Sequence, residues 1–171
     1  KVEIASGGSY VIRFHDTGFW LAKYAARKGY HKPTGTIALN YCNNLRIFRY
    51  AETLLAYAEL VGVEGVAEQK GISAQQCLDM VRDRAFGDTN HRVAVNKQNI
   101  INENHYEFVG EGHRYYDVVR WGITEVLNVD NVPGINSART WKSHNKYVAI
   151  PQGDIDATKG TEFELKQNEG Y

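Results

Sequence analysis

The stretch EFVGEGHRYYDVVRW, from Glu107 to Trp121, constrains the fold more than any other part of the chain. Its apolar residues, and those just before it, recur every three or four positions, which is typical of a helix with one buried face. We therefore predict a long third helix from about Asn99 to Trp121, with Tyr115 and Trp121 in the core. Gly110 and Gly112 each weaken such a helix by about 1 kcal/mol relative to Ala. A small residue at these positions would allow another backbone to pack closely.

The polar side of this predicted helix indicates an ionic network. Glu103, Glu107 and Glu111 follow one another at spacing four, on one helical face. Such a row of acids could bind a metal, but we favour pairing with arginines from neighbouring helices, among them Arg46 and Arg84. Arg114 and Asp117 are expected to be buried and hydrogen-bonded. The network is predicted to comprise Arg49, Glu52, Arg82, Glu107, Glu111, Arg114, Asp117 and Arg120.

Two earlier segments carry the signals of shorter helices. Asn43 or Asn44 is a plausible N-cap for a helix to about Val61, with Gly62 as its stop signal. Ser73 and Gln76 form a capping-box pattern for a second helix that ends at Gly87.

The two predicted helices form an antiparallel hairpin of the kind that builds tetratricopeptide arrays. Its core is predicted to contain apolar residues of both helices, with Tyr50 or Tyr57 at the margin: Leu54, Leu55, Leu78, Val81 and Ala85. Turn signals dominate from Asn128 to Tyr171, so an irregular C-terminal segment should wrap against the helices. The predicted fold class is all-α, and a short strand at residues 10–14 is a minor alternative.

Four segments, in this order, resemble motifs of one protein family. They are RYAETLLAYAEL at 49–60, VRDRA at 81–85, EGHRYYDVVRW at 111–121, and IPQGDI followed by QNEGY at the end. Together they are similar to the SusD/RagB family of bacterial outer-membrane nutrient-binding lipoproteins. The chain departs from the family pattern at Asn104, Asp154 and Glu169.

The resemblance implies that residues 1–171 are a single C-terminal SusD/RagB-like domain, a fragment of a longer chain. It implies capture of glycans or other nutrients at the cell surface and delivery to a TonB-dependent outer-membrane transporter. Membrane attachment would come from an N-terminal lipid anchor that is absent from this fragment. A helical-repeat scaffold that binds protein only, and a carbohydrate-active enzyme, are the rival functions.

Composition argues against several other functions. Lys plus Arg and Asp plus Glu both number 20, so the formal net charge is zero, whereas nucleic-acid binders usually carry a basic excess. No phosphate-binding loop, dinucleotide fingerprint, nucleophile elbow or metal-type histidine pair occurs. We therefore expect no catalytic residues, no metal and no cofactor. Cys42 and Cys77 are not in a metal-type spacing and are expected to be free thiols.

Aromatic residues supply the candidate ligand contacts. The chain has 11 Tyr and 3 Trp, and rings of this kind can stack on the flat faces of sugars while polar side chains bind the hydroxyls. The early irregular segment and a later one each contain a group of such residues. The candidates are Trp20, Tyr24, Tyr30, His31 and Trp141. The alternative is that each ring only packs irregular backbone onto the helices.

Overall fold

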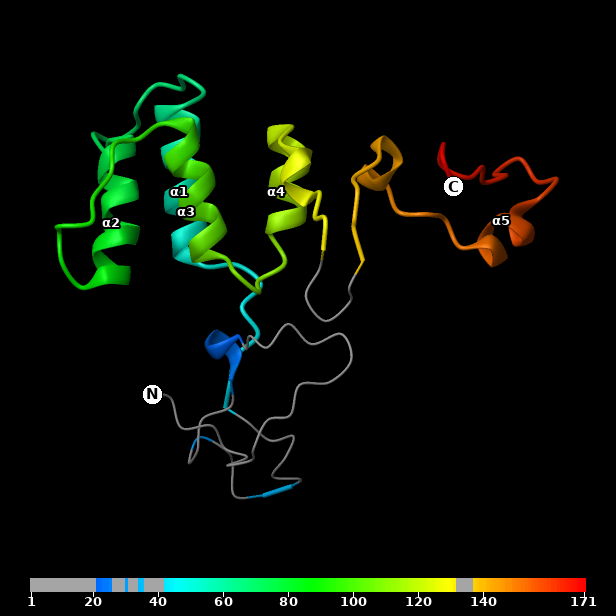
Figure 1. Ribbon diagram of the computed structural model, residues 1–171, viewed down its shortest axis with the longest axis horizontal. Helices are drawn as coiled ribbons and strands as arrows, with labels where there is room; N and C mark the ends of the chain where they lie inside the picture. Colours follow the sequence, from blue (N-terminus) through cyan, green and yellow to red (C-terminus); the bar gives the residue numbers. More distant parts are fainter. Residues whose placement is uncertain (1–20, 26–29, 31–33, 36–41, 132–136) are drawn as a thin grey trace. The chain divides into compact units, whose positions relative to one another are not determined.

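The computed structural model describes residues 21–25, 30, 34–35, 42–131 and 137–171 (Figure 1). These residues form helices and no named strand; isolated β-bridges join Gln69 to Ile72 and Val129 to Arg139. The all-α fold class is confirmed. The short strand predicted at residues 10–14 lies outside the described residues. The α-helices are α1 (Tyr50–Gly62), α2 (Ala74–Phe86), α3 (Lys97–Glu107), α4 (Arg114–Trp121) and α5 (Gln152–Thr158).

The chain divides into two compact units. The first contains the described residues up to Tyr115, and the second contains those from Tyr116 onward. Short 3₁₀ helices lie in both: η1 (Ala22–Tyr24) in the first, and η3 (Thr124–Leu127) and η4 (Ser143–Lys146) in the second.

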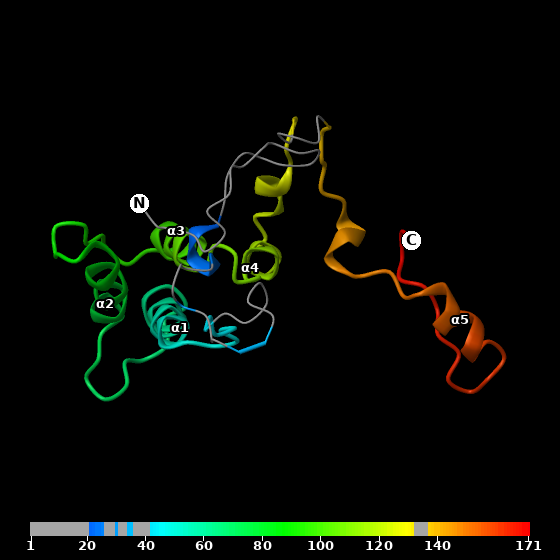
Figure 2. The same cartoon turned by 90° about the horizontal axis from the view of Figure 1, so that it is seen from below.

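The α1–α2 hairpin is the core of the first unit, and α3 packs beside α1 (Figures 1 and 2). Of the five predicted hairpin contacts, Leu54, Leu55, Leu78 and Val81 belong to one buried cluster, whereas Ala85 is exposed. Tyr57 packs at the margin of the cluster, whereas Tyr50 is 66% exposed. The tetratricopeptide-like hairpin is therefore present, and its buried face ends one turn earlier on α2 than predicted.

The ends of α2 follow the sequence signals closely. Ser73 accepts a hydrogen bond from the Gln76 backbone, and the Gln76 side chain accepts one from the Ser73 backbone, which completes the capping box. Gly87 takes the left-handed conformation at φ 78°, which suits a residue without a Cβ, and it ends the helix.

The predicted start of α1 is wrong. The helix begins at Tyr50 after Arg49, not near Asn43 or Asn44. Leu45 and Phe48 are 83% and 65% exposed, so the residues before Arg49 have no buried face to stabilise a helix.

The prediction of one long third helix is also wrong, because the structure has two helices there, α3 and α4. Residues 108–113 form a turn in which Gly110 and Gly112 adopt φ values of 76° and 83°. Neither value is compatible with an α-helix. A Cβ at Gly110 would lie 2.1 Å from the Leu21 side chain. The predicted close packing at this glycine is therefore present, but the neighbour is a side chain rather than a backbone, and the glycine lies in a turn rather than in a helix. Tyr115 is 39% exposed and is not a core residue, contrary to prediction.

The C-terminal segment is irregular as predicted, apart from α5 and η4. The Gln167 side chain bonds both the N–H and the carbonyl of Ile150, and Asn168 donates to the Val148 carbonyl. The Tyr171 hydroxyl donates to the Tyr147 carbonyl at 2.8 Å. Side-chain bonds to backbone groups thus substitute for secondary structure in this segment.

Candidate functional site

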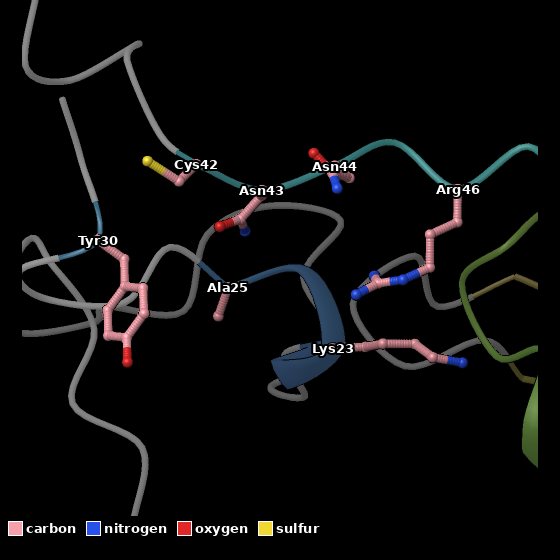
Figure 3. A pocket seen from close by; sticks show the side chains of 7 residues that line it. All are labelled: Lys23, Ala25, Tyr30, Cys42, Asn43, Asn44 and Arg46. Carbon is pink, nitrogen blue, oxygen red and sulfur yellow. The ribbon is translucent and has the colours of Figure 1, made fainter.

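A cavity of about 230 Å³ lies in the first unit, between the segment around η1 and the segment before α1 (Figure 3). We call it the Tyr30 pocket. Its described lining residues are Lys23, Ala25, Tyr30, Cys42, Asn43, Asn44 and Arg46.

Direct bonds join the two walls of the pocket. The Asn43 side-chain amide donates to the Tyr24 carbonyl at 3.1 Å, and the Cys42 backbone N–H donates to the Tyr30 carbonyl at 3.1 Å. The Arg46 guanidinium lies 5.8 Å from the centre of the Tyr24 ring, a cation–π arrangement. Tyr24 is therefore in contact with two residues of the pocket lining, Asn43 and Arg46.

The lining suits a neutral, hydroxyl-rich ligand. Amide, guanidinium and phenol groups are present, and no described lining residue is a carboxylate. Tyr30 is 63% exposed, so its ring is open to a partner. Figure 3 shows the Lys23 side chain extending toward the Arg46 side of the pocket, away from Tyr30.

An ionic cluster lies next to the pocket and shares Lys23 with it. Glu111, whose side chain is 2% exposed, accepts two hydrogen bonds from Arg49 at 2.8 and 2.9 Å. Lys23 pairs with the same carboxylate and donates to the Glu107 carbonyl. The Glu107 carboxylate pairs with Arg49 and with Arg84 of α2. The predicted pairing of Glu107 and Glu111 with arginines from other segments of the chain is therefore present.

The electrostatics of the cluster favour its charged form. Burial opposes the charge of Glu111, but hydrogen bonds from Arg49 and Lys23 outweigh it and lower the pKa of Glu111 below its ordinary value. Burial likewise opposes the charge of Arg49, yet hydrogen bonds to Glu111 and Glu107 raise its pKa. The Arg49 guanidinium also lies 4.7 Å from the centre of the Phe108 ring.

A second ion pair lies between α2 and α3, apart from the pocket lining. Arg82 pairs with Glu103 at 2.5 Å, and the Glu103 side chain is 5% exposed. Arg82 also donates to the His91 carbonyl, which ties the α2–α3 connection to the helices.

Four predicted network members lie elsewhere. Asp117 pairs with Arg120, three residues along α4, at 2.8 Å. Arg114 Nη1 is buried without a hydrogen-bond partner, contrary to the predicted bond. Glu52 Oε2 is also buried without a hydrogen-bond partner, and His113 Nε2 lies 4.0 Å from it.

The predicted ligand residues have different locations. Tyr30 lines the pocket and Tyr24 contacts its lining residue Asn43, whereas Trp20 and His31 lie outside the described residues. Trp141 belongs to the second unit, is half-buried, and its backbone N–H donates to Asn128 at 2.6 Å.

Sequence reasoning missed the amide wall of the pocket. The adjacent Asn43 and Asn44 were interpreted as an N-cap, whereas both line the cavity. Asn43 and Asn44 lie eleven and ten residues before Leu54, the first buried hydrophobic residue of α1, and this long separation from the core was the available signal. In the described part of the chain, no group of three or more His, Cys, Asp or Glu side chains could bind a metal.

Comparison with known proteins gives matches over nearly the whole chain. Residues 10–171 match the SusD family. The surface glycan-binding protein A from Bacteroides fluxus has 53% sequence identity and a TM-score of 0.83, covering 99% of this chain and 36% of that chain. The surface glycan-binding protein A from Bacteroides thetaiotaomicron, solved in complex with laminarihexaose, has 42% identity and a TM-score of 0.76, covering 95% and 33%. A laminarin-binding SusD-like protein has 32% identity and a TM-score of 0.70, covering 95% and 31%.

The chain therefore spans about a third of the length of these solved relatives, between 31% and 36%. Its fold is theirs over nearly all of its own length, and the four ordered motifs lie within the residues matched by the family. This chain belongs to the SusD family.

Proposed function

We propose that the protein containing this chain is a surface glycan-binding protein that captures laminarin-type glucans and delivers them to a TonB-dependent transporter. The main support is the 42% identity, over 95% of this chain, to a protein solved with laminarihexaose. The 32% identity to a laminarin-binding relative supports the same ligand class. The mechanism is binding and transfer without cleavage of glycosidic bonds.

We assign the Tyr30 pocket a part in sugar binding. A ring that is 63% exposed can stack on the C–H face of a glucose unit, and the Asn43 and Asn44 amides can bond its hydroxyls. A volume of about 230 Å³ is below the usual range of pockets for larger ligands, which favours a single sugar unit. Trp20, Tyr24, His31 and Trp141 remain candidate contacts to longer chains.

The binding test is calorimetry of the full-length protein with laminarihexaose. Tyr30→Ala should weaken binding about tenfold, which corresponds to ~1.4 kcal/mol. The control is Tyr106→Ala on α3, because Tyr106 is 67% exposed and does not line the pocket. Equal affinities of wild type and Tyr30→Ala would reject this pocket as a sugar site. Release of shorter sugars by the wild type would reject pure binding.

Cell-surface location and the transporter are separate parts of the proposal. In the described residues, no helix is both long enough and apolar enough to cross a membrane. Separately, the match to the SusD family supports the proposal that a lipid anchor attaches the full protein to the outer membrane. The test is protease accessibility on intact cells, followed by detergent co-purification with a SusC-like transporter. A protein shielded from protease in intact cells would overturn the surface location.

A further inference from the structure

Both walls of the Tyr30 pocket are bound to one carboxylate that the sugar itself would not touch. Lys23, from the η1 wall, pairs with Glu111. Arg49 donates two hydrogen bonds to the same carboxylate, at 2.8 and 2.9 Å. Arg49 follows Arg46, a residue of the opposite wall, by three positions.

We propose that Glu111 is a positioning residue for the Tyr30 pocket, setting the spacing of the two walls and thereby the affinity for a sugar unit. This inference rests on the proposed glycan-binding function. Glu111 is not among the described lining residues, so its effect passes through Lys23 and Arg49.

The relative strength of the contacts supports this role. The direct bonds between the walls, from Asn43 to Tyr24 and from Cys42 to Tyr30, are neutral. The bonds to Glu111 are charge-assisted, which makes them roughly twice as strong as neutral ones. The carboxylate they share is shielded from water, since the Glu111 side chain is 2% exposed, while the side chains of Arg49 and Lys23 are 19% and 30% exposed.

The charged groups around Glu111 come from four elements. Lys23 belongs to η1, Arg49 precedes α1, and Glu107 at the end of α3 shares Arg49. Arg84 of α2 reaches Glu107 and completes the group. Two of these cations pair with Glu111 directly, so protonation of Glu111 would weaken the connections to both walls together.

The experiment compares Glu111→Gln with Glu103→Gln in calorimetry of the full-length protein with laminarihexaose. Glu103 is the matched control because its side chain is 5% exposed and pairs with Arg82, at a distance from the pocket lining. Glu111→Gln should weaken binding about tenfold, whereas Glu103→Gln should change it less than about twofold. Arg49→Lys is the second variant, because lysine retains the positive charge but cannot donate two parallel hydrogen bonds to the carboxylate. It should weaken binding by a smaller factor than Glu111→Gln does.

The pH profile separates positioning from a general loss of structure. Wild-type affinity should fall as the pH approaches the pKa of Glu111 from above, and the affinity of Glu111→Gln should lack this component. Similar affinity losses in Glu111→Gln and Glu103→Gln would overturn the positioning role. If Tyr30→Ala weakens binding in that case, the proposed function stands and only the role of Glu111 fails. If Tyr30→Ala has no effect, the pocket assignment fails and the positioning role fails with it.

Discussion

At the scale of single residues, Glu111 links pH to stability. Burial alone would raise the pKa of Glu111, but Arg49 and Lys23 lower it, so the folded pKa lies below the unfolded value. The resulting stability is fully present above the unfolded pKa and is lost as the pH falls through the folded one. Loss of one partner of a buried pair costs about 3–5 kcal/mol.

We therefore expect Glu111→Gln to melt well below wild type at pH 7, with the difference shrinking in acid. Thermal denaturation followed by circular dichroism between pH 7 and 3 measures this difference. The prediction is wrong if the gap between the two melting temperatures is constant across that range.

The two thiols should differ sharply in reactivity. Cys42 is exposed in the Tyr30 pocket, whereas Cys77 is 2% exposed in the helical core, where burial raises its pKa. Since the thiolate is the reactive form, a thiol reagent should label Cys42 rapidly and Cys77 only after denaturation. Mass spectrometry of the labelled native protein checks this, and Cys42→Ser is the control that should remain unlabelled. Bound laminarihexaose should slow the labelling of Cys42.

At the scale of elements, the turn between α3 and α4 depends on two glycines. Gly110 and Gly112 both have positive φ, so replacement of either by Ala should cost about 1 kcal/mol. Only at Gly110 would the new Cβ also meet Leu21, at 2.1 Å, and crowding of this kind typically adds about 1–3 kcal/mol. Urea unfolding should place Gly110→Ala below Gly112→Ala in stability. The reverse order would contradict this packing of Leu21 against the turn.

The α1–α2 hairpin should depend on its buried leucines. Leu55 is fully buried in the core cluster, so Leu55→Ala should lower the free energy of unfolding by about 2–5 kcal/mol. Leu60 lies on the same helix but is 50% exposed, and Leu60→Ala provides the control with a clearly smaller loss. Chemical denaturation of both variants makes the comparison. Equal losses would mean that the hairpin core is not packed as described.

At the scale of the whole molecule, charge balance bears on the ligand. The formal net charge is zero, and laminarin-type glucans are neutral, so long-range attraction contributes little to their encounter. We expect calorimetric affinity for laminarihexaose to change less than about twofold between 50 and 500 mM NaCl. A steep decrease of this affinity with salt would contradict the expectation.

Local signals determined the features that depend on neighbouring residues along the chain. The Ser73–Gln76 capping box and the Gly87 stop are such features, because every bond they need lies within one turn of helix. The apolar period likewise identified Leu55 and Leu78 as core residues, and four ordered motifs were enough to indicate the SusD family.

Tertiary structure alone decided where contacts between distant segments outweigh local pattern. Helical spacing continues through residues 108–113, yet Gly110 and Gly112 take positive φ and Glu111 turns toward Arg49 and Lys23. The walls of the Tyr30 pocket are likewise joined by contacts between distant residues, such as the bond from Asn43 to the Tyr24 carbonyl, 19 residues earlier in the chain. Bonds of this kind cannot be predicted from residue spacing, because they join residues that are far apart in the sequence and close only in the folded structure.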